Sequence, residues 1–259
     1  MQPAKRQCVF CGRSAPEVRI TREHVYRKAF KQVLDQAPPF RWKSAQPALG
    51  RDEEERTQPH SIFDTQVNAV CAQCNNEWLN TKVEQPAEEH LKQMMLGMPL
   101  EIDRAASLNI SRWAAKTAAM RALVDPPPYP IPSEHFRWIM ERLEPPPYTA
   151  VWLGRCSTTK CSLGRQVRIG VEGSGRSTGH ITTIHLGAMA LFVTGAADTA
   201  AAVNLEHHFR TFTHFPLLQL WPFSGRTSFH NAPALSPYDI ADIGSGTTPD
   251  RALLANPWG

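Results

Sequence analysis

The sequence VNAVCAQCNNEW occupies residues 67–78 and holds Cys71 and Cys74 in Cys-x-x-Cys spacing. The same spacing occurs near the N-terminus, at Cys8 and Cys11. Two such pairs supply the four thiolates that close a tetrahedral structural Zn²⁺ site. We therefore predict one zinc ion bound by these four cysteines, which joins the two ends of an N-terminal module.

The other cysteines and the paired histidines carry no predicted site. Four of the six cysteines lie in the two close pairs, a pattern typical of metal ligands in a reducing compartment and not of a disulfide framework. We interpret Cys156 and Cys161 as ordinary thiols. His207 and His208 are adjacent, and adjacent residues of a strand point to opposite faces, so we assign them and His214 no role.

The candidate active-site residues lie between and beside the cysteine pairs. Glu23 and His24 form an acid–histidine pair between them, Asn68 precedes the second pair and Asn75 follows it directly. This order resembles the HNH endonucleases, the zinc-bearing branch of the ββα-metal (His-Me finger) superfamily, over residues 8–80. The resemblance implies a treble-clef-like ββα-metal zinc module, cleavage of DNA, and a catalytic divalent cation such as Mg²⁺.

The resemblance implies a role for each of these residues. His24 is expected to be the general base, since the pKa of an imidazole lies close to working pH. Glu23 and Asn75 are expected to bind Mg²⁺ or a similar hard cation, which prefers oxygen ligands. The side-chain amide of Asn68 is implied to hold the loop that orients His24. Two alternatives stay open: Glu23 could orient His24 instead of binding the metal, and Asn76 could replace Asn75 as the ligand.

Positive charge is concentrated near the N-terminus. The whole chain has a formal charge of +4, which does not by itself indicate a nucleic-acid partner. Residues 1–31 contain eight basic and two acidic residues, a formal charge of +6, so the remaining chain carries −2. A basic segment around the acid–histidine pair favours a phosphodiester substrate, because cations bind phosphates independently of base sequence. A solvated basic N-terminus is the alternative.

The length of 259 residues, 42% of them hydrophobic, allows a small module and a larger domain. We predict an α+β protein in two parts. Residues 1–98 form the ββα-metal zinc module with an exposed polar insertion at 37–65, and residues 99–259 form an accessory domain of unknown role. That domain is predicted to be helical first and then antiparallel and β-rich, with the change marked by proline clusters at 126–128 and 145–147.

Hydrophobic periodicity and the positions of glycine and proline predict the individual elements. The predicted helices are residues 25–34, a helix opened by Cys71 and interrupted at Pro86, a helix from Pro86 that Gly97 caps, residues 107–124, and residues 133–143 capped by Ser133. The predicted strands are residues 17–20, 149–153, 166–171, 181–186, 190–194 and 217–221, with a turn at 173–175. Residues 224–259 are predicted to be loop or extended tail.

The cellular location is predicted from the absence of long apolar runs in the sequence. No apolar run approaches the roughly 20 residues that span a bilayer, and no apolar stretch follows the basic start of the chain. We therefore expect a cytoplasmic protein. The resemblance to the HNH endonucleases implies a bacterial or phage-infected cell and DNA as the partner, with RNA as an alternative. The competing class is a non-catalytic zinc module that binds nucleic acid or a protein partner, and metal-dependent cleavage distinguishes the two.

Overall fold

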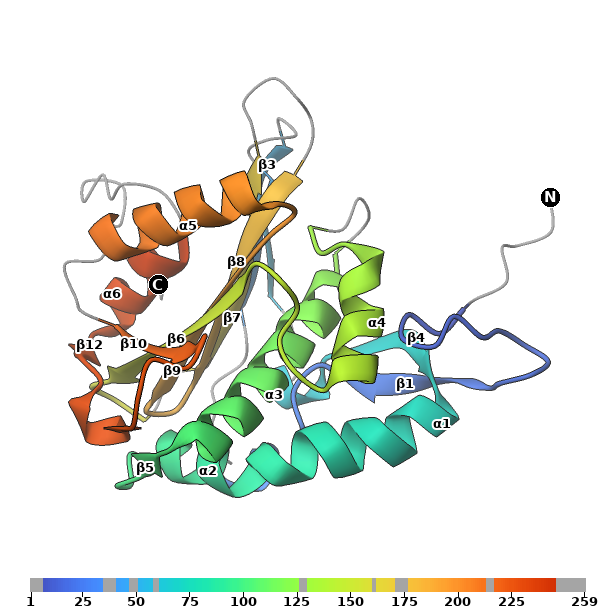
Figure 1. Ribbon diagram of the computed structural model, residues 1–259, viewed down its shortest axis with the longest axis horizontal. Coiled ribbons are helices and arrows are strands. Elements are labelled where there is room, and N and C mark those ends of the chain that lie inside the picture. The colour runs from blue at the N-terminus through green and yellow to red at the C-terminus, as the bar shows by residue number, and fades with distance from the viewer. Residues whose placement is uncertain are drawn as a thin grey trace.

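Helices and strands are mixed in the computed structural model, which confirms the predicted α+β class. The structure describes residues 7–34, 41–46, 51–57, 61–125, 130–159, 162–170, 177–212 and 217–245. Figure 1 shows a large twisted sheet and, to one side of it, a short strand pair beside a long helix. Within the described residues, no helix is both long and apolar enough to cross a membrane.

Two antiparallel strands carry the acid–histidine pair. β1 (Ile20–His24) pairs with β4 (Gln66–Cys71), and the residues at their ends face each other. The register shifts between Thr21 and Glu23. The strand predicted at 17–20 therefore begins only at Ile20, because pairing with β4, and not local alternation, decides its bounds.

The last residue of β4 leads directly into one long helix. Its parts are α1 (Ala72–Cys74), the π-helix η4 (Asn75–Glu84) and α2 (Gln85–Met95). As predicted, Pro86 lies in the first turn of the next helical segment, α2, where proline is tolerated. The chain stays helical across this point, and only the helix type changes from π to α. Gly97 ends the helix as predicted, with φ of +71° and backbone hydrogen bonds of the Schellman type.

The segment after β1 is less helical than predicted. The helix expected at 25–34 is reduced to the short 3-10 helix η1 (Lys28–Gln32). Val25, Tyr26 and Phe30 are nevertheless fully buried. Their helix-like spacing thus reflects core packing of an irregular segment.

The insertion predicted as an exposed loop at 37–65 contains regular structure. β2 (Arg41–Gln46) and β3 (Arg51–Thr57) form an antiparallel hairpin that lies against β7 (Ser162–Gly170). The 3-10 helix η3 (Ile62–Asp64) follows, and its two apolar residues are buried. The prediction is therefore wrong for these parts, because backbone pairing and apolar packing order a segment of polar composition. The remaining parts, 37–40, 47–50 and 58–60, lie outside the described residues.

Two helices follow the N-terminal module. α3 (Arg104–Ala122) confirms the helix predicted at 107–124 and begins earlier, where Asp103 caps it by accepting a backbone amide hydrogen bond of 2.9 Å. α4 (Ser133–Arg142) is also confirmed. Ser133 does not cap it, because this serine is already the first helical residue. The proline cluster at 126–128 lies outside the described residues.

The C-terminal part is an antiparallel sheet with strand order β10-β6-β9-β8-β7, and the short β12 (Ala234–Leu235) pairs parallel with β6. The bounds of the remaining strands are β6 Thr149–Cys156, β8 Ser177–Leu186, β9 Met189–Ala196 and β10 Leu218–Trp221. The predicted antiparallel strands are thus confirmed, while the turn predicted at 173–175 lies outside the described residues.

The two faces of this sheet pack against different helices (Figure 1). Leu191 and Val193 of β9 belong to the core that includes α3, whereas the residues that alternate with them belong to a core formed with α5 (Thr199–Phe212) and α6 (Pro237–Ser245). This alternation follows from the two-residue period of a strand. Both faces are therefore covered, and α3 lies between the sheet and the N-terminal module.

The described residues after β9 contain more helix and strand than their sequence predicts. The adjacent histidines lie on the helix α5, and not on a strand, because the helix buries Leu205 and Phe209 against the sheet. The loop or tail predicted from residue 224 is wrong as far as Ser245, since this segment contains β11 (Thr227–Ser228), which pairs with β5 (Glu101–Ile102), then η5 (Phe229–Asn231), β12 and α6. Cys161, His214 and residues 246–259 lie outside the described residues.

One apolar core joins the two predicted domains. Phe10 of the N-terminal module, Trp113 of α3 and Val193 of β9 belong to the same buried cluster. A domain boundary between residues 98 and 99 stays a prediction. The continuity of the core does mean that side chains of α3 reach the interior of the N-terminal module.

Candidate functional site

The four paired cysteines meet at one point, as their spacing predicts. Their Sγ atoms all lie within 4.8 Å of one another, and those of Cys11 and Cys71 are 3.8 Å apart. A tetrahedral zinc ion with Zn–S bonds of about 2.3 Å requires sulfur–sulfur distances of about 3.8 Å. All four are free cysteines, and all except Cys11 are buried. The cluster is therefore compatible with a structural zinc site.

Local backbone geometry brings the two cysteine pairs together. Gly12, with φ of +71°, donates its amide to the carbonyl of Cys8 at 2.8 Å and closes the first turn. Cys71 ends β4, and its Sγ accepts an amide hydrogen bond of 3.4 Å from the helix that follows. Burial raises the pKa of the Cys11 thiol, but hydrogen bonds from Arg13 and the neighbouring thiols outweigh it and lower that pKa to about 6. Cys11 is thus suited to be a thiolate near neutral pH, whereas burial raises the pKa of the Cys8 and Cys74 thiols.

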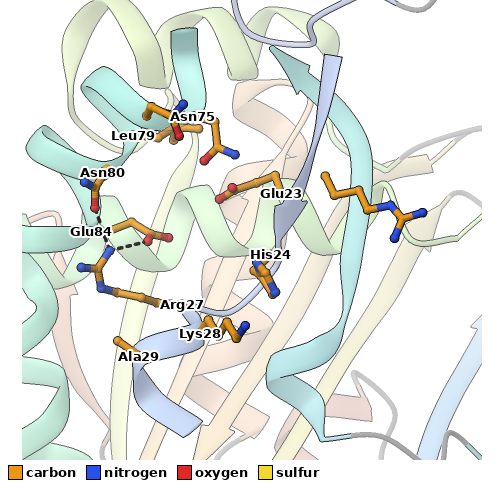
Figure 2. Close-up of a pocket in the computed structure, with 11 residues that line it drawn as sticks. Glu23, His24, Arg27, Lys28, Ala29, Asn75, Leu79, Asn80 and Glu84 are labelled. Carbon is orange, nitrogen blue, oxygen red and sulfur yellow. Dashed lines mark hydrogen bonds and ion pairs between the residues drawn. The ribbon is translucent and has the colours of Figure 1, made fainter. Parts of the chain in front are cut away.

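Glu23 and His24 lie at the end of β1, beside η4 (Figure 2). The Glu23 carboxylate is directed toward the helix and is 6% exposed. His24 is half-buried. The β1–β4 pair thus holds both members of the predicted acid–histidine pair next to the helix that begins at the second cysteine pair.

His24 is held by its neighbour on β4. Its Nε2 lies 2.7 Å from Nε2 of Gln66, the residue opposite it in the strand pair. The oxygen and nitrogen of a side-chain amide exchange places on a flip, so Gln66 either donates to the ring or accepts from it, according to the tautomer. Burial lowers the pKa of His24 below its ordinary 6.5, Lys28 lowers it further, and Glu23 opposes both. The imidazole is therefore mainly neutral at pH 7 and held in one orientation.

Glu23 is part of a buried network of ion pairs. Lys116 of α3 places Nζ 2.9 Å from Glu23 Oε1 and 2.8 Å from Glu84 Oε1. Arg27 in turn joins Glu84 Oε2, at 2.8 Å, to Glu88 Oε2, at 2.7 Å. Burial raises the pKa of Glu84, but Lys116 and Arg27 outweigh it and hold that pKa below its ordinary value. Burial lowers the pKa of Lys116, and the two carboxylates outweigh it and raise that pKa. Glu84 and Lys116 are therefore both charged at neutral pH.

The π-helix decides which side chains face this network. Asn75, Asn80 and Glu84 all line one cavity. In an α-helix, with about 3.6 residues per turn, Asn75 and Glu84 would be two and a half turns apart and on opposite faces. In η4 the hydrogen bonds reach the fifth residue along, as from the Gln85 amide to the Asn80 carbonyl, and the wider turn brings the three side chains to the same side. Such segments are rare and occur frequently at functional sites.

A cavity of about 440 Å³ opens beside the network. Its lining consists of Arg22, Glu23, His24, Arg27, Lys28, Ala29, Asn75, Asn76, Leu79, Asn80 and Glu84. Arg22 and Lys28 are exposed, and neither makes an ion pair with another described residue. The cavity therefore combines a neutral histidine and amides with charges of both signs, namely the carboxylates of Glu23 and Glu84 and the exposed cations of Arg22 and Lys28. The exposed cations suit a phosphate group.

The predicted asparagines take different positions. Asn75 lies on the cavity wall, where its Nδ2 donates to Thr21 Oγ1 at 3.4 Å, and Asn76 lines the same cavity. Asn68 is exposed on β4, and the described residues that line the cavity do not include it. Gln66, on the same strand, is the residue that contacts the His24 ring.

Glu23 and Asn75, the predicted ligands of a hard divalent cation, each use only one side-chain polar atom in their hydrogen bonds. Lys116 engages Oε1 of Glu23, which leaves Oε2, and the hydrogen bond of Asn75 leaves its Oδ1. Mg²⁺ is commonly held by one or two carboxylates and several water molecules. Glu23 and Asn75 therefore each keep an oxygen of the kind that such a cation prefers.

Sequence reasoning misses the residues that complete the site, namely Arg27, Gln66, Glu84 and Lys116. Lys116 stands 93 residues from Glu23 in the chain. The one signal that could have found it is a lysine in the mainly apolar middle of α3, between buried residues on both sides. A scan against protein-family models and searches of curated proteins and of solved structures each found no match.

Proposed function

We propose that this chain is an HNH-type endonuclease that hydrolyses phosphodiester bonds of DNA, with RNA as the alternative substrate. The observation that carries the proposal is His24, a neutral imidazole held by Gln66 in the wall of a cavity that the exposed cations Arg22 and Lys28 border. A neutral histidine in a fixed orientation is suited to accept a proton from water. The cysteine cluster supports the same family.

We assign the four cysteines to one structural Zn²⁺ and the N-terminal module to the treble-clef, ββα-metal type. The turn at Cys8, the β1–β4 pair and the helix after Cys71 follow one another in the order that this type requires. Four protein thiolates leave a zinc ion no open position, so its role would be structural. Such an ion contributes on the order of 10 kcal/mol of folding free energy.

In the proposed reaction, His24 removes the proton of the attacking water. In the tautomer with the proton on Nε2, the Gln66 amide is flipped so that its oxygen accepts from Nε2–H. Nδ1 is then the basic nitrogen and takes the proton as the water oxygen attacks phosphorus. The bond from phosphorus to the 3′ oxygen breaks, and that oxygen leaves as a hydroxyl after taking a proton from solvent. General-base assistance of this kind contributes about 10²–10⁴ in rate.

The remaining residues bind and orient the substrate. Arg22 and Lys28 would pair with phosphate oxygens at the mouth of the cavity. Glu23 Oε2 and Asn75 Oδ1 would hold Mg²⁺ or a similar cation, with Asn76 as the alternative to Asn75. When bound, such a cation neutralises the phosphoryl group and stabilises the departing oxygen.

Plasmid cleavage tests the proposal. Purified protein is incubated with supercoiled, linear and single-stranded DNA, with and without Mg²⁺, beside His24→Ala. The variant should lose about 10²–10⁴ in rate and keep its zinc content and DNA affinity, because it lacks the base but no phosphate contact. His230→Ala, which replaces an exposed histidine on η5, is the matched control and should cleave normally. Cleavage by His24→Ala at the parent's rate would exclude His24 as the base.

A zinc module that binds without cutting is the second candidate. It is favoured by the contact of Glu23 with Lys116, which takes an oxygen from the predicted metal ligand. Such a protein would retard DNA in a gel shift, or bind a protein partner, without cleaving DNA at any divalent cation concentration. Cleavage that is lost in His24→Ala contradicts this candidate.

A further inference from the structure

Lys116 places a positive charge between two carboxylates at the edge of the proposed cation site. Its side chain has no solvent exposure. Nζ lies 2.9 Å from Glu23 Oε1, 2.8 Å from Glu84 Oε1 and 3.4 Å from the backbone carbonyl oxygen of His24. These contacts match the three donors of an ammonium group. Lys116 thus engages one oxygen of each carboxylate and the backbone at His24 together.

The two engaged carboxylate oxygens could hold one small cation. Both approach the same nitrogen atom, at 2.9 and 2.8 Å. Ca²⁺ binds oxygen at about 2.3–2.6 Å, so an ion at the position of Nζ requires the carboxylates to move by only a few tenths of an ångström. In the folded protein the ammonium fills this position. A divalent cation at Glu23 is left with Oε2.

We infer that Lys116 is a positioning residue that limits the cation site at Glu23 to a single carboxylate oxygen and so keeps its affinity for hard cations low. The inference rests on the cation site of the proposed function, but not on DNA cleavage itself. The network is balanced, with three carboxylates, Glu23, Glu84 and Glu88, against three cations, Arg27, Lys92 and Lys116. Loss of the Lys116 charge leaves it net negative and attractive to a divalent ion.

Calcium titration of the full-length, zinc-loaded protein tests this inference. Ca²⁺ takes oxygen ligands and does not compete for the cysteine thiolates. Lys116→Met removes the charge and keeps an unbranched side chain. Isothermal titration calorimetry should show that this variant binds Ca²⁺ at least about tenfold more tightly than the parent, because a nearby unit charge of the same sign has been removed.

Two further variants keep the test decisive. Lys116→Met/Glu84→Gln removes one charge of each sign and relieves the unpaired buried carboxylate, so it should fold and bind Ca²⁺ more tightly than the parent but less tightly than Lys116→Met. Lys31→Met is the matched control, because Lys31 is 45% exposed and pairs with Asp64 outside the network. Its Ca²⁺ affinity should equal that of the parent.

The outcomes separate this inference from the proposed function. Equal or weaker Ca²⁺ affinity in both Lys116 variants would overturn the inference. A Lys116 variant that folds only in the presence of Ca²⁺ supports the inference. A Lys116 variant that stays unfolded even in Ca²⁺ counts against it. If the expected order of affinities holds but the parent never cleaves DNA, the nuclease proposal fails and the role of Lys116 stands. If the parent cleaves DNA but the Ca²⁺ affinities are equal, the role inferred for Lys116 fails and the nuclease proposal stands.

Discussion

Replacement of Glu84 by glutamine removes one charge from the centre of the buried network and should destabilise the protein by about 3 kcal/mol. Glu84 accepts hydrogen bonds from Lys116 and Arg27, each at 2.8 Å, and its side chain is 11% exposed. Breaking a buried ion pair costs about 3–5 kcal/mol. The lower end applies because the amide oxygen still accepts one hydrogen bond and Lys116 keeps its contact with Glu23. The amide nitrogen, however, faces a second donor.

Urea unfolding at pH 7, followed by far-ultraviolet circular dichroism, measures this loss. A change of about 3 kcal/mol corresponds to a Tm lower by roughly 6–12 °C for a chain of this length. Glu89→Gln is the matched control on the same helix, since Glu89 is exposed and its carboxylate accepts a 3.3 Å hydrogen bond from Gln93. It should change the unfolding free energy by less than about 0.5 kcal/mol. Equal stability of Glu84→Gln and the parent would refute the reasoning.

The difference in unfolding free energy between the parent and Glu84→Gln should also depend on pH, which provides an independent check. The folded-state pKa of Glu84 lies below its ordinary 4.5, so its stabilising contribution is present above pH 4.5 and is lost as pH falls through the lower folded-state value. The pKa of Lys116 is raised above 10.5, so its contribution is present below that pH and is lost as pH rises through the higher folded-state value. The gap between parent and Glu84→Gln should therefore be largest near neutral pH and shrink in acid.

Three other outcomes are expected. Cys71→Ser should lose zinc and unfold the N-terminal module, because a structural zinc supplies on the order of 10 kcal/mol of folding free energy. Elemental analysis measures the zinc content and thermal melting measures the unfolding. Unchanged zinc content contradicts the assignment. Glu23→Gln should move the acidic limb of the pH–rate profile for cleavage to lower pH. Burial lowers the pKa of His24 and the Glu23 charge raises it, so loss of that charge lowers the pKa further. An unmoved limb argues against His24 as the base. Gly187→Ala should destabilise the protein in urea unfolding by more than Gly97→Ala. A Cβ at Gly187 would clash with the backbone carbonyl oxygen of Met95 in α2, whereas at Gly97, also at positive φ, it makes an ordinary 3.5 Å contact. Equal losses would contradict this.

Short-range signals account for the parts of the protein that the sequence predicts. Cys-x-x-Cys spacing predicts which four cysteines meet, because each pair needs only a local turn, such as the one closed by Gly12. The two-residue alternation of apolar residues predicts the strands of the C-terminal sheet, and the proline and glycine positions predict the end of α2 at Gly97. His24 and Asn75 are predicted by their order around the cysteine pairs and do line one cavity.

Other elements depend on packing partners that lie far away in the chain. The helix expected at 25–34 gives way to an irregular segment because Tyr26 and Phe30 enter a core shared with α3. The polar insertion at 37–65 becomes partly regular because its strands pair with each other and lie against β7. Helical or polar composition alone cannot distinguish these outcomes, since both depend on long-range contacts.

The sequence by itself determined the four-cysteine cluster, the acid–histidine pair and the α+β class, because the spacing of residues close together in the chain predicts each of them. Only the tertiary structure decided what surrounds His24. The π-helix turns Glu84 to the side of Asn75, whereas an α-helix would separate them, and this choice depends on the packing of the whole helix. Lys116 reaches Glu23 because α3 crosses the module, and the low polarity of that interior makes the pairing of its charges obligatory.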